Sequence, residues 1–190
     1  AFPIFDRRQL LSGTAAAALA FAAPSLAPAQ APRRGGTLRV SVDQAPSKLN
    51  PLLHRVNPEY VLGELLYSGL TRLAPDMSAE PDLAESWSPN AELTEWTFKL
   101  RSGVSFHDAS PLTARDVVAT FEAILDPKTA SPARQNIGPV AKVAAKDETT
   151  VVFTLSAPFA DLPVTLAYLY AKIVPAAVIK GGLEKLDRQA

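Results

Sequence analysis

WTFKLRSGVSFHDASPLTARDVV, residues 96–118, contains in succession a strand pattern, a turn and the start of a helix. Residues 95–101 alternate between polar and apolar, so Trp96, Phe98 and Leu100 share one face of an extended segment. Such alternation is typical of a strand that is buried on one face and wet on the other.

A second short alternating segment follows this strand. Ser102-Gly103 is a turn signal, and Val104 and Phe106 continue the apolar period beyond it. The pattern predicts that the extended segment resumes after the turn.

A helix is predicted to begin after Thr113. Thr113 and Asp116 have the spacing of a capping box, with Asp in place of the usual Glu, and a carboxylate in the first turn is favoured by the helix dipole. Asp126-Pro127 ends the helix, because proline has no N–H to donate and clashes with the preceding turn. The apolar face at helical spacing consists of Val117, Val118, Phe121, Ile124 and Leu125.

The flanking sequence predicts further short elements in an alternating order. They are a strand at 37–42, a loop at 43–51, a helix at 60–67, a strand at 70–73, a hairpin of 140–145 and 149–155, a helix at 163–170 and an extended segment at 172–175. Gly181-Gly182 then interrupts the chain before a polar stretch.

Composition excludes several classes of protein. The 190 residues include 19 basic and 19 acidic ones, so the net charge of zero argues against a nucleic-acid binder. The absence of cysteine excludes disulfides, thiolate metal sites, a cysteine nucleophile and a lipidated cysteine. The length fits one domain on a prior of about 100–200 residues.

The sequence predicts no catalytic residues, no metal site and no cofactor. There are two histidines, whereas a zinc site usually takes three or four protein ligands, and a mixed site of both histidines with carboxylates is the open alternative. No nucleophile elbow, phosphate-binding loop or dinucleotide fingerprint occurs. His107 and Asp108 are interpreted as turn residues with a local hydrogen bond.

The N-terminal 31 residues are predicted to be an export signal. Arg7-Arg8 precedes 23 uncharged, alanine-rich positions, and Ala29-Gln30-Ala31 has the small-x-small pattern that signal peptidase accepts. Paired arginines before a weakly apolar region resemble a twin-arginine signal, which predicts a periplasmic protein. The general secretory route and an uncleaved anchor are the alternatives.

The central sequence closely resembles one family of binding proteins. The runs LAESW (83–87), TFKLRSGVSFHD (97–108) and PLTARDVVATFEAI (111–124) resemble the signature of extracellular solute-binding proteins of family 5, the dipeptide-, oligopeptide- and nickel-type receptors of ABC importers. Ala109 departs from the family, which usually has Gly there. The signature residues, which we expect to be structural, are Trp96, Phe98, Arg101, Gly103, Phe106, His107, Asp108, Pro111, Thr113, Asp116 and Val117.

The resemblance implies an α/β fold of the periplasmic binding protein type, with two lobes, an extra subdomain and a ligand enclosed between the lobes. Residues 32–44 would be the entry strand of the first lobe, 45–170 the inserted α/β subdomain, and 171–190 the truncated start of a return to the first lobe. The second lobe would then be absent from this chain.

The implied function is non-enzymatic binding of a peptide or similar small solute by a monomer, which delivers it to an ABC permease and ATPase complex in the inner membrane. A receptor for a metal chelate or opine-like solute, a periplasmic hydrolase and a non-functional truncated product are the alternatives. Strand ends line the clefts of open α/β sheets, so Asp43, Gln44, Ala45 and Pro46 are predicted to form a cleft wall.

Overall fold

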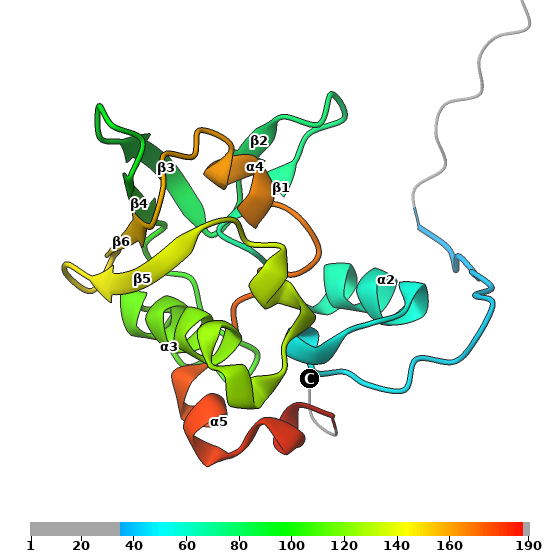
Figure 1. Ribbon diagram of the computed structural model, residues 1–190. Coiled ribbons are helices and arrows are strands. Elements are labelled where there is room, and N and C mark those ends of the chain that lie inside the picture. Colours follow the sequence, from blue (N-terminus) through cyan, green and yellow to red (C-terminus); the bar gives the residue numbers. More distant parts are fainter. Residues whose placement is uncertain (1–34, 188–190) are drawn as a thin grey trace, which may run out of the picture. The chain divides into compact units, whose positions relative to one another are not determined.

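The computed structural model describes residues 35–187 and divides the chain into two units, residues 1–40 and 41–190 (Figure 1). The predicted export signal, with Arg7, Arg8, Ala29 and Ala31, lies outside the described residues.

The prediction of a strand at 37–42 is wrong. These residues form no helix or strand, and Leu38 and Val40 are 87% and 71% exposed. An extended segment becomes a strand only when its N–H and C=O groups pair with a neighbour. No strand among the described residues pairs with this one.

The second unit is built on a four-stranded antiparallel sheet. Its strands are β3 (Ala84–Pro89), β4 (Glu95–Leu100), β5 (Val140–Ala145) and β6 (Thr150–Leu155), in the order β3-β4-β6-β5. The alternating strand and the hairpin predicted from the sequence are therefore confirmed, while β3 was not predicted as a strand.

One face of this sheet forms the core. Phe98 and Phe153 are fully buried on the central strands, and their rings meet edge to face at 5.2 Å. The helix α3 (Ala114–Leu125) covers this face and places Phe121 4.8 Å from Phe153, again edge to face. Aromatic pairs in this geometry contribute about 0.5–1.5 kcal/mol beyond the area that they bury.

The start of α3 agrees with the predicted capping box. The backbone N–H of Thr113 donates to Asp116 Oδ2 at 2.9 Å, and the Thr113 hydroxyl donates to the same oxygen at 2.8 Å. The helix ends at Leu125, where Asp126 begins a short 3₁₀ turn instead.

The remaining elements are short and surround the sheet. They are η1 (Pro51–Leu53), α2 (Asn57–Leu66), the two-stranded sheet of β1 (Thr71–Leu73) and β2 (Ala79–Pro81), η2 (Pro127–Thr129), η3 (Pro132–Gln135), α4 (Leu162–Leu166), α5 (Ala176–Gly181) and η4 (Leu183–Asp187). No helix among residues 35–187 is long and apolar enough to cross a membrane.

Several predicted boundaries differ from the structure. The helix predicted at 60–67 begins earlier, at Asn57, because Pro58 suits the first turn of a helix. The helix predicted at 163–170 is only the five-residue α4. The strand predicted to resume at Val104 does not do so, since only Ser105 forms a bridge, to Pro111.

Candidate functional site

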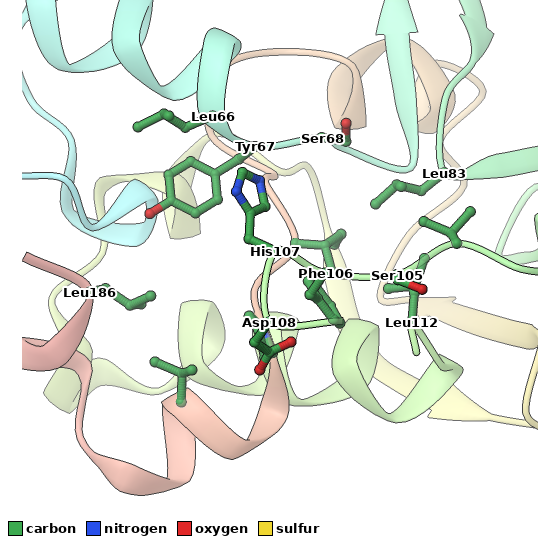
Figure 2. A pocket seen from close by; sticks show the side chains of 14 residues that line it. Leu66, Tyr67, Ser68, Leu83, Ser105, Phe106, His107, Asp108, Leu112 and Leu186 are labelled. Carbon is green, nitrogen blue, oxygen red and sulfur yellow. The ribbon is translucent and has the colours of Figure 1, made fainter. Parts of the chain in front are cut away.

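One cavity in the second unit has a volume of about 470 Å³, within the size range of ligand pockets (Figure 2). One wall is the signature loop, defined here as residues 104–112, and the other is the C-terminal segment, residues 173–187. Leu66, Tyr67, Ser68 and Leu83 complete the lining, which is mostly apolar.

The signature loop is a tight hairpin-like turn. The N–H of Phe106 donates to the Ser110 carbonyl, and the N–H of Ala109 donates to the Phe106 carbonyl, both at 2.9 Å. Asp108 Oδ1 accepts from the N–H of Ser110 at 2.9 Å and from its hydroxyl at 2.6 Å. These bonds, first of all the one from the hydroxyl, hold the pKa of Asp108 below its usual value. Asp108 thus makes the local hydrogen bonds expected of a turn residue.

Ala109 has a φ of +65°, in the left-handed region that usually favours glycine. The family's usual Gly therefore suits the backbone here, and the alanine of this chain adopts the same conformation at a cost.

His107 has a different environment from Asp108. It is exposed, and its ring lines the cavity together with Tyr67 (Figure 2). Tyr67 is half-buried, and burial raises the pKa of its hydroxyl, helped by the negative charge of Asp187. These groups offer hydrogen bonding but not a nucleophile with an adjacent base. No metal-binding group of three or more histidine or carboxylate side chains occurs within residues 35–187.

The helix of the signature holds the C-terminal segment in place. Asp116 Oδ1 accepts from the N–H of Ala176 at 2.8 Å, so one carboxylate both caps α3 and anchors α5. The hydroxyl of Thr120, buried on the same helix, lies 3.2 Å from both the N–H and the carbonyl oxygen of Val174. Thr120 is a polar residue beside the apolar face of the predicted helix, and this pattern is the sequence feature that could have predicted the contact.

Other signature residues pack in the core of the second unit or bind its backbone. Trp96, Phe98 and Val117 are buried, and Trp96 Nε1 donates to the Phe159 carbonyl at 3.1 Å. The guanidinium of Arg101 donates to the Asp82 carbonyl. The remaining signature residues belong to two turns and the cap of α3, namely Gly103, Phe106, Pro111 and Thr113.

The predicted cleft wall is not part of this cavity. Asp43, Gln44, Ala45 and Pro46 are exposed and line neither the main cavity nor a second one of about 360 Å³ beside Arg55. Their contact with a solute stays a prediction.

A buried lysine next to this region forms an ion pair that was not predicted from the sequence. Lys172 is 3% exposed and lies between apolar neighbours, and its Nζ is 2.7 Å from Glu64 Oε1. A lysine in an otherwise apolar segment is the signal that would have identified it, since lysine is rarely buried without a partner.

Comparison with known proteins identifies the family. The model of bacterial extracellular solute-binding proteins, family 5 Middle, matches residues 78–189. The probable D,D-dipeptide-binding periplasmic protein DdpA of Escherichia coli is 35% identical over 140 residues, which are 71% of this chain and 27% of DdpA.

Solved structures of similar proteins support the same family. AgaA from Agrobacterium tumefaciens R10, in complex with agropinic acid, has a TM-score of 0.72 and 32% identity, covering 77% of this chain and 30% of AgaA. OppA of Haemophilus influenzae, in complex with the peptide RPPGFSPFR, has a TM-score of 0.66 and 25% identity, over 72% of this chain and 30% of OppA. The α/β fold expected from the resemblance is confirmed, and the chain spans less than a third of each of these relatives. The chain belongs to the bacterial extracellular solute-binding proteins of family 5.

Proposed function

We propose that this chain is part of the solute-binding component of an ABC importer, which binds a small solute in the periplasm without covalent chemistry and delivers it to a permease and ATPase complex in the inner membrane. The observation that supports this proposal most is the family match over residues 78–189. Members of this family are binding proteins rather than enzymes.

The solute that we propose is a peptide. DdpA is described as a dipeptide-binding protein and OppA holds a nonapeptide, so two of the compared relatives favour this class. A non-peptide solute is the second candidate, because AgaA holds agropinic acid and has the higher TM-score of the two compared structures.

We also propose the layout expected from the sequence. Residues 1–31 would be a twin-arginine signal, 32–44 the entry into the first lobe, 45–170 the inserted subdomain and 171–190 the return to the first lobe. The full-length protein would be a monomer, and most of its contacts with the solute would lie beyond this chain, with Asp43, Gln44, Ala45 and Pro46 forming one wall of the cleft.

Sequencing the DNA beyond the codon for Ala190 tests this layout. A continuous frame that codes for a second lobe supports it, and a frame without any second lobe beyond it contradicts it. The product of the continuous frame is then screened by thermal shift against dipeptides, longer peptides and opine-like acids. A bound solute raises the midpoint by mass action. Stabilisation by peptides supports the proposed solute, and stabilisation by opine-like acids alone favours the second candidate.

The export signal is tested separately. Residues 1–31 are fused to a reporter that is active in the periplasm only when it folds before export. Replacing Arg7 and Arg8 together by Lys is expected to abolish periplasmic activity, because twin-arginine recognition depends on the arginine pair. Unchanged export of the double variant would support the general secretory route instead.

A further inference from the structure

His54 is buried, and burial favours the neutral form of its ring. The residue is 2% exposed, and neither ring nitrogen has a hydrogen-bond partner among the described residues. Its ring packs directly on the backbone of α2, where a Cβ added to Gly63 would lie 2.9 Å from His54 Cε1. Tyr60 closes another side, edge to face at 5.9 Å.

The last described turn, η4, covers this part of the molecule. Asn50 precedes η1, is fully buried and donates from Nδ2 to the Leu183 carbonyl at 3.1 Å. Its backbone N–H lies 3.4 Å from Asp187 Oδ1. Leu186 is buried, at 3% exposure. Figure 1 shows this red turn close to the cyan turn that precedes α2.

The chain before η4 is held by contacts that do not involve His54. Ala176 is bound to Asp116 of α3, and Val174 is bound to Thr120. Between α5 and η4 lies Gly181-Gly182, and Gly182 has a φ of +110°, a conformation open to glycine but rarely to other residues. The glycine pair therefore gives the backbone between α5 and η4 the conformational freedom that an opening of η4 would need.

Charged groups around His54 favour the imidazolium, but burial outweighs them. The Leu49 carbonyl favours a proton on the ring although it makes no hydrogen bond with either ring nitrogen, and the carboxylates of Glu59 on α2 and Asp187 on η4 attract a positive charge. Tyr60 and Tyr67 are neutral. Loss of solvation is nevertheless the largest effect, and the pKa of His54 lies below its ordinary value.

We propose that protonation of His54 releases the turn η4 from the turn η1 that it covers. A buried imidazolium gains solvation when η4 opens, whereas the neutral ring tolerates burial. The open state thus binds a proton more readily than the closed state. Closure is fully favourable above the ordinary histidine pKa and weakens as pH falls toward the lowered value. This device is independent of the proposed solute binding.

Hydrogen–deuterium exchange of the whole chain tests the proposal, with rates corrected for the intrinsic effect of pH. Between about pH 7.5 and about pH 5.5, opening of residues 183–187 is expected to increase by up to roughly tenfold per pH unit below the ordinary histidine pKa. Exchange in α3, residues 114–125, serves as the internal reference.

The two histidines of the chain provide matched variants. His107→Gln should keep the acid-induced opening, and His54→Gln should remove its pH dependence. If His54→Gln does not fold, the wild-type chain provides a second measurement. The Cε1 proton resonance of His54 is followed by NMR as the pH is changed, and His107→Gln identifies which of the two histidine resonances it is. This resonance should titrate with a pKa below the ordinary histidine value. Acid-induced opening that persists in His54→Gln, or a His54 resonance that titrates at the ordinary pKa, would overturn the proposal.

Discussion

Ala109 shows how one residue can conflict with its own backbone. Its φ of +65° places the Cβ of an L-residue close to a carbonyl oxygen, and a left-handed conformation costs roughly 1–2 kcal/mol. Glycine adopts this conformation without steric strain. It also gives the unfolded chain more conformational freedom, and this offsets part of the stability gained by relieving the strain. The sequence predicted a turn here from His107 and Asp108, and the position where this chain departs from the family's usual glycine is the one with the left-handed backbone.

Ala109→Gly is therefore expected to raise the free energy of unfolding by about 0.5–1 kcal/mol. Urea denaturation monitored by tryptophan fluorescence measures the change. Gly103→Ala is the matched control: Gly103 has a φ of +73° and open space around it, so the reverse change should destabilise through the backbone alone. A loss of stability in Ala109→Gly would show that the alanine is not strained.

Glu59 is a buried carboxylate whose role was not predicted from the sequence. It is 2% exposed, and Oε1 accepts from the Ser47 hydroxyl at 2.6 Å while Oε2 accepts from the N–H of Arg55 at 2.8 Å. Burial by itself would raise the pKa of this carboxyl, but these bonds together with a backbone bond from Val56 hold the pKa below its usual value.

Glu59→Gln is expected to destabilise the chain by about 1–3 kcal/mol at neutral pH, because the amide group cannot accept both sets of donors. A lowered carboxyl pKa contributes stability above the ordinary value near 4.5, and this stability disappears as pH falls through the lowered value. The variant should accordingly lose less stability than the wild type between about pH 5 and about pH 3. Equal acid sensitivity of the two proteins, measured by urea denaturation, would contradict the assignment.

At the scale of elements, the strongest patterns predicted the strongest structures. The strand at 95–100, the hairpin after Val140 and the capped helix at 114–125 each carry a clear period with its own start or stop signal. The elements that were missed, β2, β3 and α5, are short or lack such a period. Their existence depends on neighbours, since β3 pairs with β4 along an edge and α5 is anchored by Asp116.

The contact between α2 and the segment after α4 gives a prediction at this scale. Lys172 is buried and Glu64 is 42% exposed, so the cation depends on its partner more than the carboxylate does. Glu64→Gln is expected to lower the free energy of unfolding by about 1–3 kcal/mol. This loss is smaller than the loss expected for a fully buried ion pair, because Glu64 is partly solvated.

Lys172→Met should lower the free energy of unfolding less than Glu64→Gln does, to within about 1 kcal/mol of the wild-type value. The methionine removes the buried charge and keeps an apolar side chain of similar length. The double variant completes a thermodynamic cycle by thermal denaturation. A larger loss in Lys172→Met than in Glu64→Gln would mean that the ammonium makes contacts more important than the ion pair.

For the whole molecule, residues 37–42 matter because no strand in the described part of the chain pairs with them. Leu38 and Val40 are among the most exposed large apolar side chains of residues 35–187, on a segment of alternating sequence. Such a segment can pair with other chains.

Leu38→Ser with Val40→Ser is accordingly expected to reduce concentration-dependent association, measured by light scattering after size-exclusion chromatography. Arg39→Ser, on the polar side of the same alternation, is the control and should leave association unchanged or increase it. If the double variant and the wild type associate to the same extent, the surface responsible for association lies elsewhere.

The sequence by itself determined the family and the central strand–turn–helix, because these depend on local periodicity, turn residues and caps that act within a few positions along the chain. It also indicated that residues 107 and 108 form a turn. Only the tertiary structure decided that residues 37–42 are not a strand, that Glu59 and Lys172 are buried, and that His54 lies against Gly63. Burial and strand pairing depend on residues distant in sequence, and no local pattern records which distant segment will supply the partner.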